Sequence, residues 1–404
     1  MSAILDKLLK GQNVEWHTIE QIFHLRNGYT PSKSNEAYWT NGTIPWFRME
    51  DIRENGNILD SALQQISESA VKGNKLFPKN SFIIATSATI GEHALITVPY
   101  LANQRFTNLS LKDDFINRFN IYFLYYYLFK LDEWCRNNTT MSSFASVDMN
   151  GFRKFEIPIP PLNVQDEIVR ILDAFTAVTA ELTAELTAEL NMRERQYQYY
   201  RDKLLDFSHR DIEWTTLDKV SLVIDSLHQT PKYSENGLNM IRVTDIKSGL
   251  IDLSKTLKVD QETFKIFTKK YLPKKFDLVI SRVGSYGNVA VVPEDNVVCM
   301  GQNTVVINPL INSIFLYHIL TSKNTKLFIE KNVGGGNQKT LSLKSIKEIP
   351  IPSIDFKEQG YIANILSKFE TLTHSITEGL PKEITLREQQ YEYYREQLID
   401  FPKN

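Results

Sequence analysis

The chain has 404 residues, of which 42% are hydrophobic and 23% charged, as expected of a soluble globular protein with two or three domains. No apolar run approaches the roughly 20 residues that a membrane span needs, and the N-terminus lacks a signal-peptide pattern, so we expect a cytoplasmic protein without membrane contact. The two cysteines, Cys135 and Cys299, are far apart in sequence, which excludes a disulfide scaffold and argues against a structural zinc site.

The net charge of −2 is unevenly distributed along the chain. Residues 1–160 carry 16 basic and 16 acidic side chains, 161–207 carry 5 and 9, 208–344 carry 18 and 13, and 345–404 carry 7 and 10. The net charges of 0, −4, +5 and −3 sum to −2. Chance variation of a solvated surface explains this division as well as nucleic-acid binding does, although the basic excess falls in a globular segment.

Two globular segments are predicted, residues 1–160 and residues 208–352. Each contains short apolar runs separated by turn residues, then a glutamine motif, then a helical stretch, which indicates a mixed α+β domain. In the first segment these are FIIATSATIGEHALITV (82–98), ANQRF (102–106) and NIYFLYYYLF (120–129). In the second they are DLVISRVGSYGNVAVV (277–292), GQNTVVI (301–307) and SIFLYHIL (313–320).

A helical segment follows each globular one, over residues 161–207 and 353–404. Apolar side chains recur there every three or four residues, and the IPIP stretch before each segment is typical of a domain end and a helix start. We expect the two long helices to pair antiparallel as a coiled coil that separates the globular domains. Gly379 and Pro381 interrupt the second segment and predict a kink or a break there.

The two halves of the chain are copies of one unit. With a shift of 194 residues, 17 of the 38 residues from Arg170 to Phe207 are identical to their counterparts. The segment LDKLLKGQNVEWHTI (5–19) also resembles RDKLLDFSHRDIEWTTL (201–217), so the N-terminus looks like the end of a third helix copy. The sequence predicts a circularly permuted duplication with approximate twofold symmetry.

The sequence TAEL occurs three times, as Thr179–Leu182, Thr183–Leu186 and Thr187–Leu190. A helix-forming composition is sufficient to explain this run. However, one added copy would lengthen a helix by about 6 Å and turn its end by about 40° beyond a full turn. One base pair of DNA turns by roughly 34 to 36°, so the repeat is a candidate spacer that is adjustable in steps of about one base pair.

Polar, loop-like pieces recur at equivalent places in both halves and supply candidate DNA contacts, because Arg, Lys, Asn and Gln read base edges while Ser, Thr and Lys hold phosphates. A surface or turn role would explain any one of them, whereas their recurrence as a set favours binding. The candidates are Thr30, Ser32 and Lys33 in GYTPSKS (28–34), Arg48 and Arg53 in PWFRMEDIR (45–53), Arg105, Thr230, Lys232 and Tyr233 in HQTPKYS (228–234), Arg242 and Lys247 in IRVTDIK (241–247), Arg282, and Asn337, Gln338 and Lys339 in GGGNQKT (334–340).

Sequence signatures of catalysis are absent. GGGNQKT lacks the spacing of a phosphate-binding loop, and no G-x-G-x-x-G follows a predicted strand. The histidines, including His93, His228 and His318, lack metal-ligand spacing and are assigned ordinary surface or core roles. We therefore expect no catalytic residue, no metal and no cofactor in this chain, with any catalysis supplied by partners.

The chain resembles the specificity subunits of type I restriction-modification enzymes over essentially its whole length. The resemblance is carried by the duplicated IPIP-then-helix segments with Gln165 and Gln359, the GYTPSKSNEAYWTNGTIPW stretch (28–46), and the closing QYxYYRxxLxxF in both halves. The TAEL repeats are similar to those of the type IC branch, in which the repeat number sets the spacer.

This resemblance implies two target-recognition domains, each reading one half of an asymmetric bipartite site in double-stranded DNA. It also implies helices that dock two methyltransferase subunits, which use S-adenosylmethionine to methylate adenine. Translocase-nuclease subunits that use ATP and magnesium would join them for restriction.

Two rival functions stay open at this point. A coiled-coil scaffold whose globular heads bind proteins would show little salt dependence of DNA affinity in the assembled complex. A chain that methylates adenine in isolation would be an enzyme in its own right.

Overall fold

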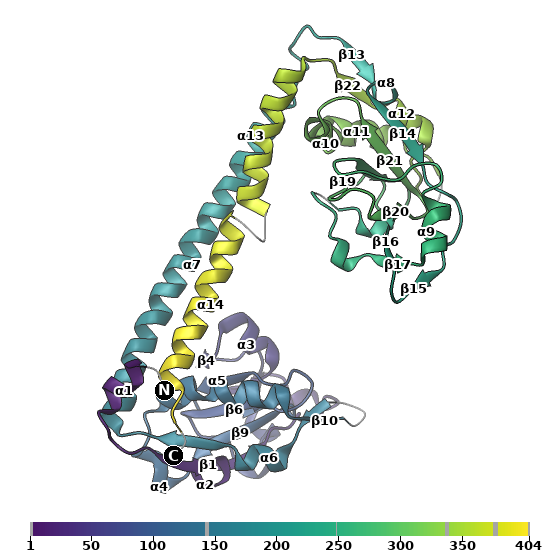
Figure 1. The fold of residues 1–404 in the computed structure, drawn as a ribbon. Helices are drawn as coiled ribbons and strands as arrows, with labels where there is room; N and C mark the ends of the chain where they lie inside the picture. The colour runs from purple at the N-terminus through teal and green to yellow at the C-terminus, as the bar shows by residue number, and fades with distance from the viewer. Residues whose placement is uncertain (1–2, 142–144, 248, 336–338, 375–378, 403–404) are drawn as a thin grey trace. The chain divides into compact units, whose positions relative to one another are not determined.

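The computed structural model describes residues 3–141, 145–247, 249–335, 339–374 and 379–402. The chain divides into two compact units, Met1–Thr183 with Leu386–Asn404, and Ala184–Thr385. Each unit contains one globular domain and parts of the long helices (Figure 1). Two candidate contacts, Asn337 and Gln338, lie outside the described residues.

The globular domain of the first unit is built on two sheets, of order β2-β9-β6-β7-β4 and β5-β3-β8. Helix α5 packs against the first of these sheets, near β7. The elements in chain order are α1 (Ala3–Leu9), β1 (Glu15–Thr18), α2 (Ile19–Ile22), β2 (Phe23–Asn27), β3 (Ile44–Phe47), α3 (Met49–Asn55), β4 (Ile58–Leu59), β5 (Gln65–Ile66), β6 (Ser81–Ala85), β7 (His93–Ile96), β8 (Leu101–Ala102), β9 (Phe106–Leu111), α4 (Asp113–Ile116), α5 (Ile121–Asn137), β10 (Thr139–Met141), β11 (Ala145–Val147), α6 (Met149–Lys154) and β12 (Glu156–Ile159).

The globular domain of the second unit repeats this plan with sheets of order β14-β21-β18-β19 and β15-β17-β16-β20. Both domains are α+β, as expected from the order of apolar runs. The elements are β13 (Trp214–Thr216), α8 (Leu217–Val220), β14 (Ser221–Asp225), β15 (Tyr233–Ser234), β16 (Leu238–Ile241), β17 (Leu257–Val259), α9 (Gln261–Phe267), β18 (Leu278–Ser281), β19 (Val289–Val291), β20 (Val298–Met300), β21 (Thr304–Pro309), α10 (Ser313–Leu320), α11 (Lys323–Asn332), α12 (Leu343–Lys347) and β22 (Pro350–Pro352).

Strand registers identify the equivalent residues of the two domains. The antiparallel ladder β2·β9 corresponds to β14·β21, and the parallel pair β3·β8 corresponds to β16·β20. Because register fixes which side of a sheet each residue faces, matched pairs occupy matched positions. The matched pairs are Asn27–Thr107 with Asp225–Val305, and Phe47–Ala102 with Ile241–Met300.

In each domain the first and last strands pair with each other in a separate two-stranded sheet. In register, Trp16 of β1 faces Pro158 of β12, and Trp214 of β13 faces Pro352 of β22. The IPIP stretches therefore form strands, which the sequence reasoning missed. Proline is tolerated here because a two-stranded sheet consists only of edges.

The long helices follow these strands. Helix α7 spans Leu162–Leu204 and contains all three TAEL copies, whereas the second segment is described as α13 (Phe356–His374) and α14 (Gly379–Ile399). Gly379 has φ +77°, and a Cβ there would lie 2.7 Å from the carbonyl oxygen of Leu372. The predicted break is thus confirmed, with Pro381 in the first turn of α14, where its missing N–H costs no helical bond.

The predicted pairing of the long helices is confirmed within each unit. Phe175 of α7 stacks on Tyr394 of α14 with ring centroids 5.4 Å apart. Tyr200 of α7 stacks on Phe369 of α13 at 5.9 Å. The shift of 194 residues maps Phe175 onto Phe369 and Tyr200 onto Tyr394, so the duplication uses one aromatic contact twice.

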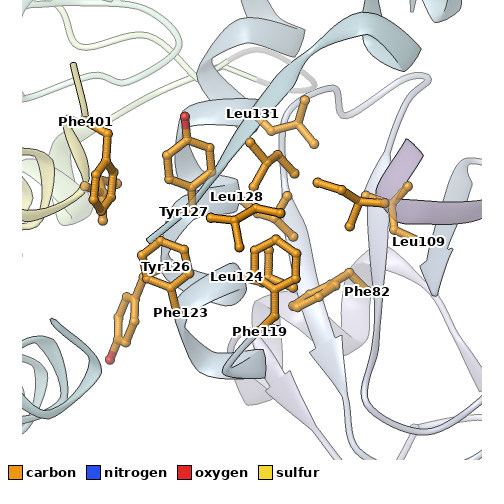
Figure 2. Close-up of a cluster of buried hydrophobic side chains, with 14 of the residues drawn as sticks. Phe82, Leu109, Phe119, Phe123, Leu124, Tyr126, Tyr127, Leu128, Leu131 and Phe401 are labelled. Atoms are coloured by element: carbon orange, nitrogen blue, oxygen red, sulfur yellow. The ribbon is translucent and has the colours of Figure 1, made fainter. Parts of the chain in front are cut away.

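The end of a long helix segment completes each domain core. In the first unit Phe401, just after α14, packs edge-to-face on Phe123 of α5 with ring centroids 5.9 Å apart (Figure 2). The surrounding cluster includes Leu124 and Leu128 from the same helix. The repeat counterpart of Phe401, Phe207, is buried in the core of the second unit.

One glutamine connects each domain to its long helix, and the two glutamines are equivalent in the duplication. Gln165 Oε1 accepts the backbone N–H of Asn120 at 2.8 Å, and Gln359 Oε1 accepts that of Asn312 at 3.0 Å. Asn120 and Asn312 are the N-caps of α5 and α10. Each buried glutamine therefore sets where the main helix of a domain begins against α7 or α13.

Candidate nucleic-acid interface

A groove in the first domain collects several of the predicted contact residues. It has a volume of about 640 Å³ and is lined by separate segments of the chain. Thr30 and Lys33 come from the loop after β2, Arg48 from the β3–α3 junction and Arg105 from the β8–β9 turn. Gln104 also lines the groove and accepts a hydrogen bond from the Thr30 hydroxyl. Hydrogen-bond donors and cations thus share one concave surface.

The loop that carries Thr30 is held in place by close backbone packing. A Cβ on Gly28 would lie 2.1 Å from the carbonyl oxygen of Asn103, so only glycine fits at this position. The next residue, Tyr29, donates its backbone N–H to the carbonyl of Ala102 at 2.8 Å. These contacts bring the loop against the β8–β9 turn and place Thr30 in the groove.

Arg48 is fixed by its backbone while its side chain stays available. Its N–H donates to Oδ2 of Asp51 at 2.6 Å, and the buried Asp51 also accepts the N–H of Leu63 at 2.6 Å. The Arg48 side chain is 33% exposed and lies 3.9 Å from Glu50, and its Nε has no hydrogen-bond partner among the described residues. Such a guanidinium is suited to a phosphate or a base edge.

The second domain brings the equivalent threonine and glutamine together. Gln302 Nε2 donates to Thr230 Oγ1 at 3.4 Å, so the same two residue types meet as in the first domain, although there Thr30 is the donor and Gln104 the acceptor. The loop before Thr230 is two residues longer, since four residues separate it from Asp225 whereas two separate Thr30 from Asn27. The contact is therefore kept despite a change in loop length.

Arg242 occupies the position of Arg48. Its backbone N–H donates to Oδ2 of Asp245 at 2.9 Å, just as Arg48 donates to Asp51. Its side chain also donates twice to Asp245, at 3.0 and 2.9 Å, and these hydrogen bonds raise the pKa of Arg242. Arg242 is thus held by a close ion pair, whereas the ion pair of Arg48 with Glu50 is longer, at 3.9 Å.

One further position carries different chemistry in the two domains. Arg282 Nη1 donates to both carboxylate oxygens of Asp225 at 3.0 Å, and its Nε donates to the carbonyl of Leu341 at 3.1 Å. These side chains are only 14% and 20% exposed. In the first domain the counterpart of Asp225 is Asn27, which accepts a hydrogen bond from Thr107 at 3.1 Å. Several Arg282 donors are therefore used within the fold.

The other predicted contacts lie apart from these groups. Lys247 lines a separate cavity of about 1110 Å³ beside α7 and α13, and the spacer positions lie along α7. The remaining side chains are exposed and do not line the groove of the first domain: Ser32, Arg53, Lys232, Tyr233 and Lys339.

Two pieces that were expected to be loops contain regular structure. PWFRMEDIR consists of most of β3 and the start of α3, and Val243–Asp245 in IRVTDIK form a 3₁₀ helix. Trp46 and Phe47 are buried, so the apolar part of the first piece belongs to the core. The prediction of a loop was wrong because it was based on the polar residues of the segment and not on this apolar pair.

The sequence reasoning did not select Gln104 or Gln302 as site residues. Both lie in the glutamine motifs that it had noted after the paired apolar runs. In both halves a glutamine follows an equivalent strand at the same distance. That recurrence could have identified Gln104 and Gln302 as site residues.

Comparison with known proteins decides the family. A profile described as the Type I restriction modification DNA specificity domain matches residues 12–192 and again residues 227–386. This chain is a member of that family. Both copies of the duplicated unit are thus specificity domains, and the chain is a DNA-specificity subunit.

Relatives of the specificity subunit are similar over 71% to 93% of its length. It is 47% identical over 399 residues to the Type I restriction enzyme EcoprrI specificity subunit of Escherichia coli, covering 93% of this chain and 92% of the relative. It is 35% identical over 308 residues to the EcoR124I/EcoR124II specificity subunit of the same organism, covering 71% and 72%. Specificity subunits are the non-catalytic components of their enzymes, and this chain has that role.

Solved structures support the same fold. A chain from a structural study of complex assembly and conformational transition in the type I R-M system superimposes with a TM-score of 0.68 at 14% identity, covering 96% of this chain and 98% of that one. The HsdS subunit from Thermoanaerobacter tengcongensis superimposes with a TM-score of 0.56 at 15% identity, covering 96% of both.

Among the described residues, no cluster of His, Cys, Asp or Glu is arranged to hold a metal ion. Within the same part of the chain, no helix combines the length and apolar character needed to cross a membrane.

Proposed function

We propose that this specificity subunit recognises a bipartite asymmetric site in double-stranded DNA, with each domain reading one half. The observation that carries the proposal is the pairing of one scaffold with two different surfaces. The strand registers match, yet Lys33 and Arg105 in the first domain correspond to Tyr233 and Asn303 in the second. Different side chains at matched positions present different donors and acceptors to DNA, and therefore select different bases.

We further propose that the candidate residues closest to the groove, Thr30, Lys33, Arg48 and Arg105, contact the first half-site. Thr230, Lys232, Tyr233 and Arg242 contact the second. Their location is supported by the groove and by its counterpart contacts. Arg282 is a weaker candidate because its guanidinium is committed to Asp225.

The partners in this proposal are two methyltransferase subunits, joined for restriction by translocase-nuclease subunits. Two equivalent tyrosines support a docking role for the helices: Tyr199 of α7 is 61% exposed and Tyr393 of α14 is 57% exposed. The shift of 194 residues relates them, so the duplication supplies one such surface per unit. S-adenosylmethionine, ATP and magnesium bind to the partners, and the complex acts in the cytoplasm.

The TAEL run is proposed as the spacer of a type IC-like subunit. Its three copies lie in uninterrupted helix, so removing one shortens α7 by about 6 Å and turns one end by about 40°. In a strain carrying the complete system without Thr187–Leu190, methylome sequencing is expected to show the same half-sites one base pair closer. An unchanged spacer would refute the spacer role.

Methylome sequencing also tests the reading of half-sites. In the complete system, Arg105→Ala is expected to relax base preference in one half of the methylated site and to leave the other half unchanged. The loss of one good base contact costs about 1 to 3 kcal/mol of discrimination. Relaxation of both halves, or of neither, would contradict the assignment of Arg105 to the reading of one half-site.

A further inference from the structure

Three residues that line the groove of the first domain have counterparts of the same type in the second. We define the shared set as Thr30, Arg48 and Gln104 in the first domain and Thr230, Arg242 and Gln302 in the second. In each domain the arginine directly follows β3 or β16, and the glutamine comes two residues after β8 or β20. The threonine directly precedes a proline and hydrogen-bonds to that glutamine.

The residues around the shared set differ in charge. We define the variable set as the three pairs that follow the same alignment of strands and turns. They are Lys33 with Tyr233, Glu50 with Thr244, and Arg105 with Asn303. A positive or negative side chain in the first domain is replaced by a neutral one in the second at all three positions.

We propose that the shared set binds the sugar-phosphate backbone, while the variable set surrounds it and reads bases. This inference rests on the proposed function. Two domains that read different half-sites meet the same backbone in both, so residues common to the domains are suited to that common feature. Phosphate and sugar take half to two-thirds of protein–DNA hydrogen bonds and hold the protein in register without reading sequence.

The chemistry of the shared set fits a phosphate. Phosphate oxygens accept hydrogen bonds, which an amide N–H group, an arginine guanidinium or a hydroxyl that is not already donating can supply. Thr30 engages only the side-chain oxygen of Gln104, and the amide N–H groups have no recorded partner within the described ranges. Arg48 adds a positive charge on a side chain that is 33% exposed.

A loop clamp is the competing role for the threonine and glutamine, and one isosteric variant separates the two roles. In Gln104→Glu, the carboxylate still accepts the Thr30 hydrogen bond, so a clamp would survive. The new negative charge and the lost N–H donors would instead repel a phosphate. The same change at Gln302 would not separate the two roles, because the Gln302 amide is itself the donor to Thr230. Arg48→Ala removes one cation of the first domain.

The test uses the specificity subunit assembled with its methyltransferase subunits and two DNA duplexes. One duplex carries the site mapped by methylome sequencing, and the other has both half-sites scrambled. Each variant of the shared set is expected to bind both duplexes roughly tenfold more weakly, as for the loss of a charged hydrogen bond. The DNA sequence that each variant complex methylates is expected to stay the same. Arg48→Ala should also lower the slope of log affinity against log salt by about one.

Lys79→Ala is the matched control, because Lys79 is an exposed cation of the first domain that does not line the groove. It is expected to bind both duplexes as the unaltered complex does. An altered base preference in a shared-set variant would overturn the inference, as would unchanged affinity for both duplexes. Normal affinity with slow methylation would also overturn it, because it would place the set against the target base.

Failure of the proposed function is a separate outcome. If the unaltered complex binds the mapped duplex no better than the scrambled one, half-site reading fails whatever the variants do. With that discrimination present, the variants alone decide the role of the shared set.

Discussion

The two recognition domains keep one framework and differ in the polar groups built onto it. At matched positions the first domain has neutral Asn27, which accepts from Thr107, whereas the second has Asp225 paired with Arg282. Arg48 lies 3.9 Å from the carboxylate of Glu50, whereas Arg242 is paired with Asp245 at 2.9 Å. Strand register and loop anchoring therefore carry the fold, and the groove chemistry is free to diverge.

The largest expected effect falls on the framework that the halves share. Phe401→Ala and Phe207→Ala each remove a buried aromatic ring that completes a domain core, and each is expected to lower the free energy of unfolding by about 3 to 5 kcal/mol. Denaturant unfolding, followed by a probe in each unit, checks this. Each variant should destabilise the unit that contains the altered residue. A loss below about 1 kcal/mol in either would show that the two helix ends are not equivalent.

A smaller loss of stability is expected from removing the residue at the matched position that is charged in one domain and neutral in the other. Asp225→Ala leaves the guanidinium of Arg282 without its carboxylate in a mostly buried place, and the variant is expected to lose about 2 kcal/mol, less than for a fully buried pair. Asn27→Ala removes only a neutral acceptor and should cost about 1 kcal/mol. Unfolding of both variants under the same conditions gives the comparison. Equal losses would mean that the ion pair adds nothing beyond a hydrogen bond.

The third effect is a pH dependence expected from the second domain. Burial lowers the pKa of His318 to about 3 from its ordinary value of 6.5, and its ring nitrogens have no hydrogen-bond partner among the described residues. Because the unfolded chain takes up a proton below about pH 6.5 and the folded chain does not, stability falls as pH drops from about 6.5 toward 3.

His318→Met removes this loss, and its advantage over the unaltered chain is expected to grow below pH 6.5 to about 1 to 2 kcal/mol at pH 5. Parallel denaturation series at pH 8 and pH 5 measure that advantage. An advantage that does not change with pH would contradict a neutral buried imidazole.

Much of the architecture could be predicted because duplication makes the sequence its own comparison. The recurrence of Tyr200 as Tyr394 and of Phe175 as Phe369 located the helices, and periodicity gave their pairing. The break at Gly379 followed from backbone chemistry alone. Local pattern reasoning failed at IPIP, whose strand role depends on pairing with residues more than 130 positions away.

The site was harder to predict because its residues meet only in three dimensions. Thr30 and Gln104 are 74 residues apart, and no local pattern joins them. Arg282 was a reasonable candidate by residue type, yet Asp225 and Leu341 occupy several of its donors. The sequence does not reveal such contacts, because a long-range polar partner depends on the strand order that brings the loops together.

The most direct test of the central claim is to give the chain the same recognition domain twice. Residues 214–352 are replaced by residues 16–158, using the matched Trp–Pro pairs as junctions. Methylome sequencing of cells carrying this chain with its partner subunits is expected to show a site whose second half has become a copy of the first. Retention of the original second half-site would contradict the account.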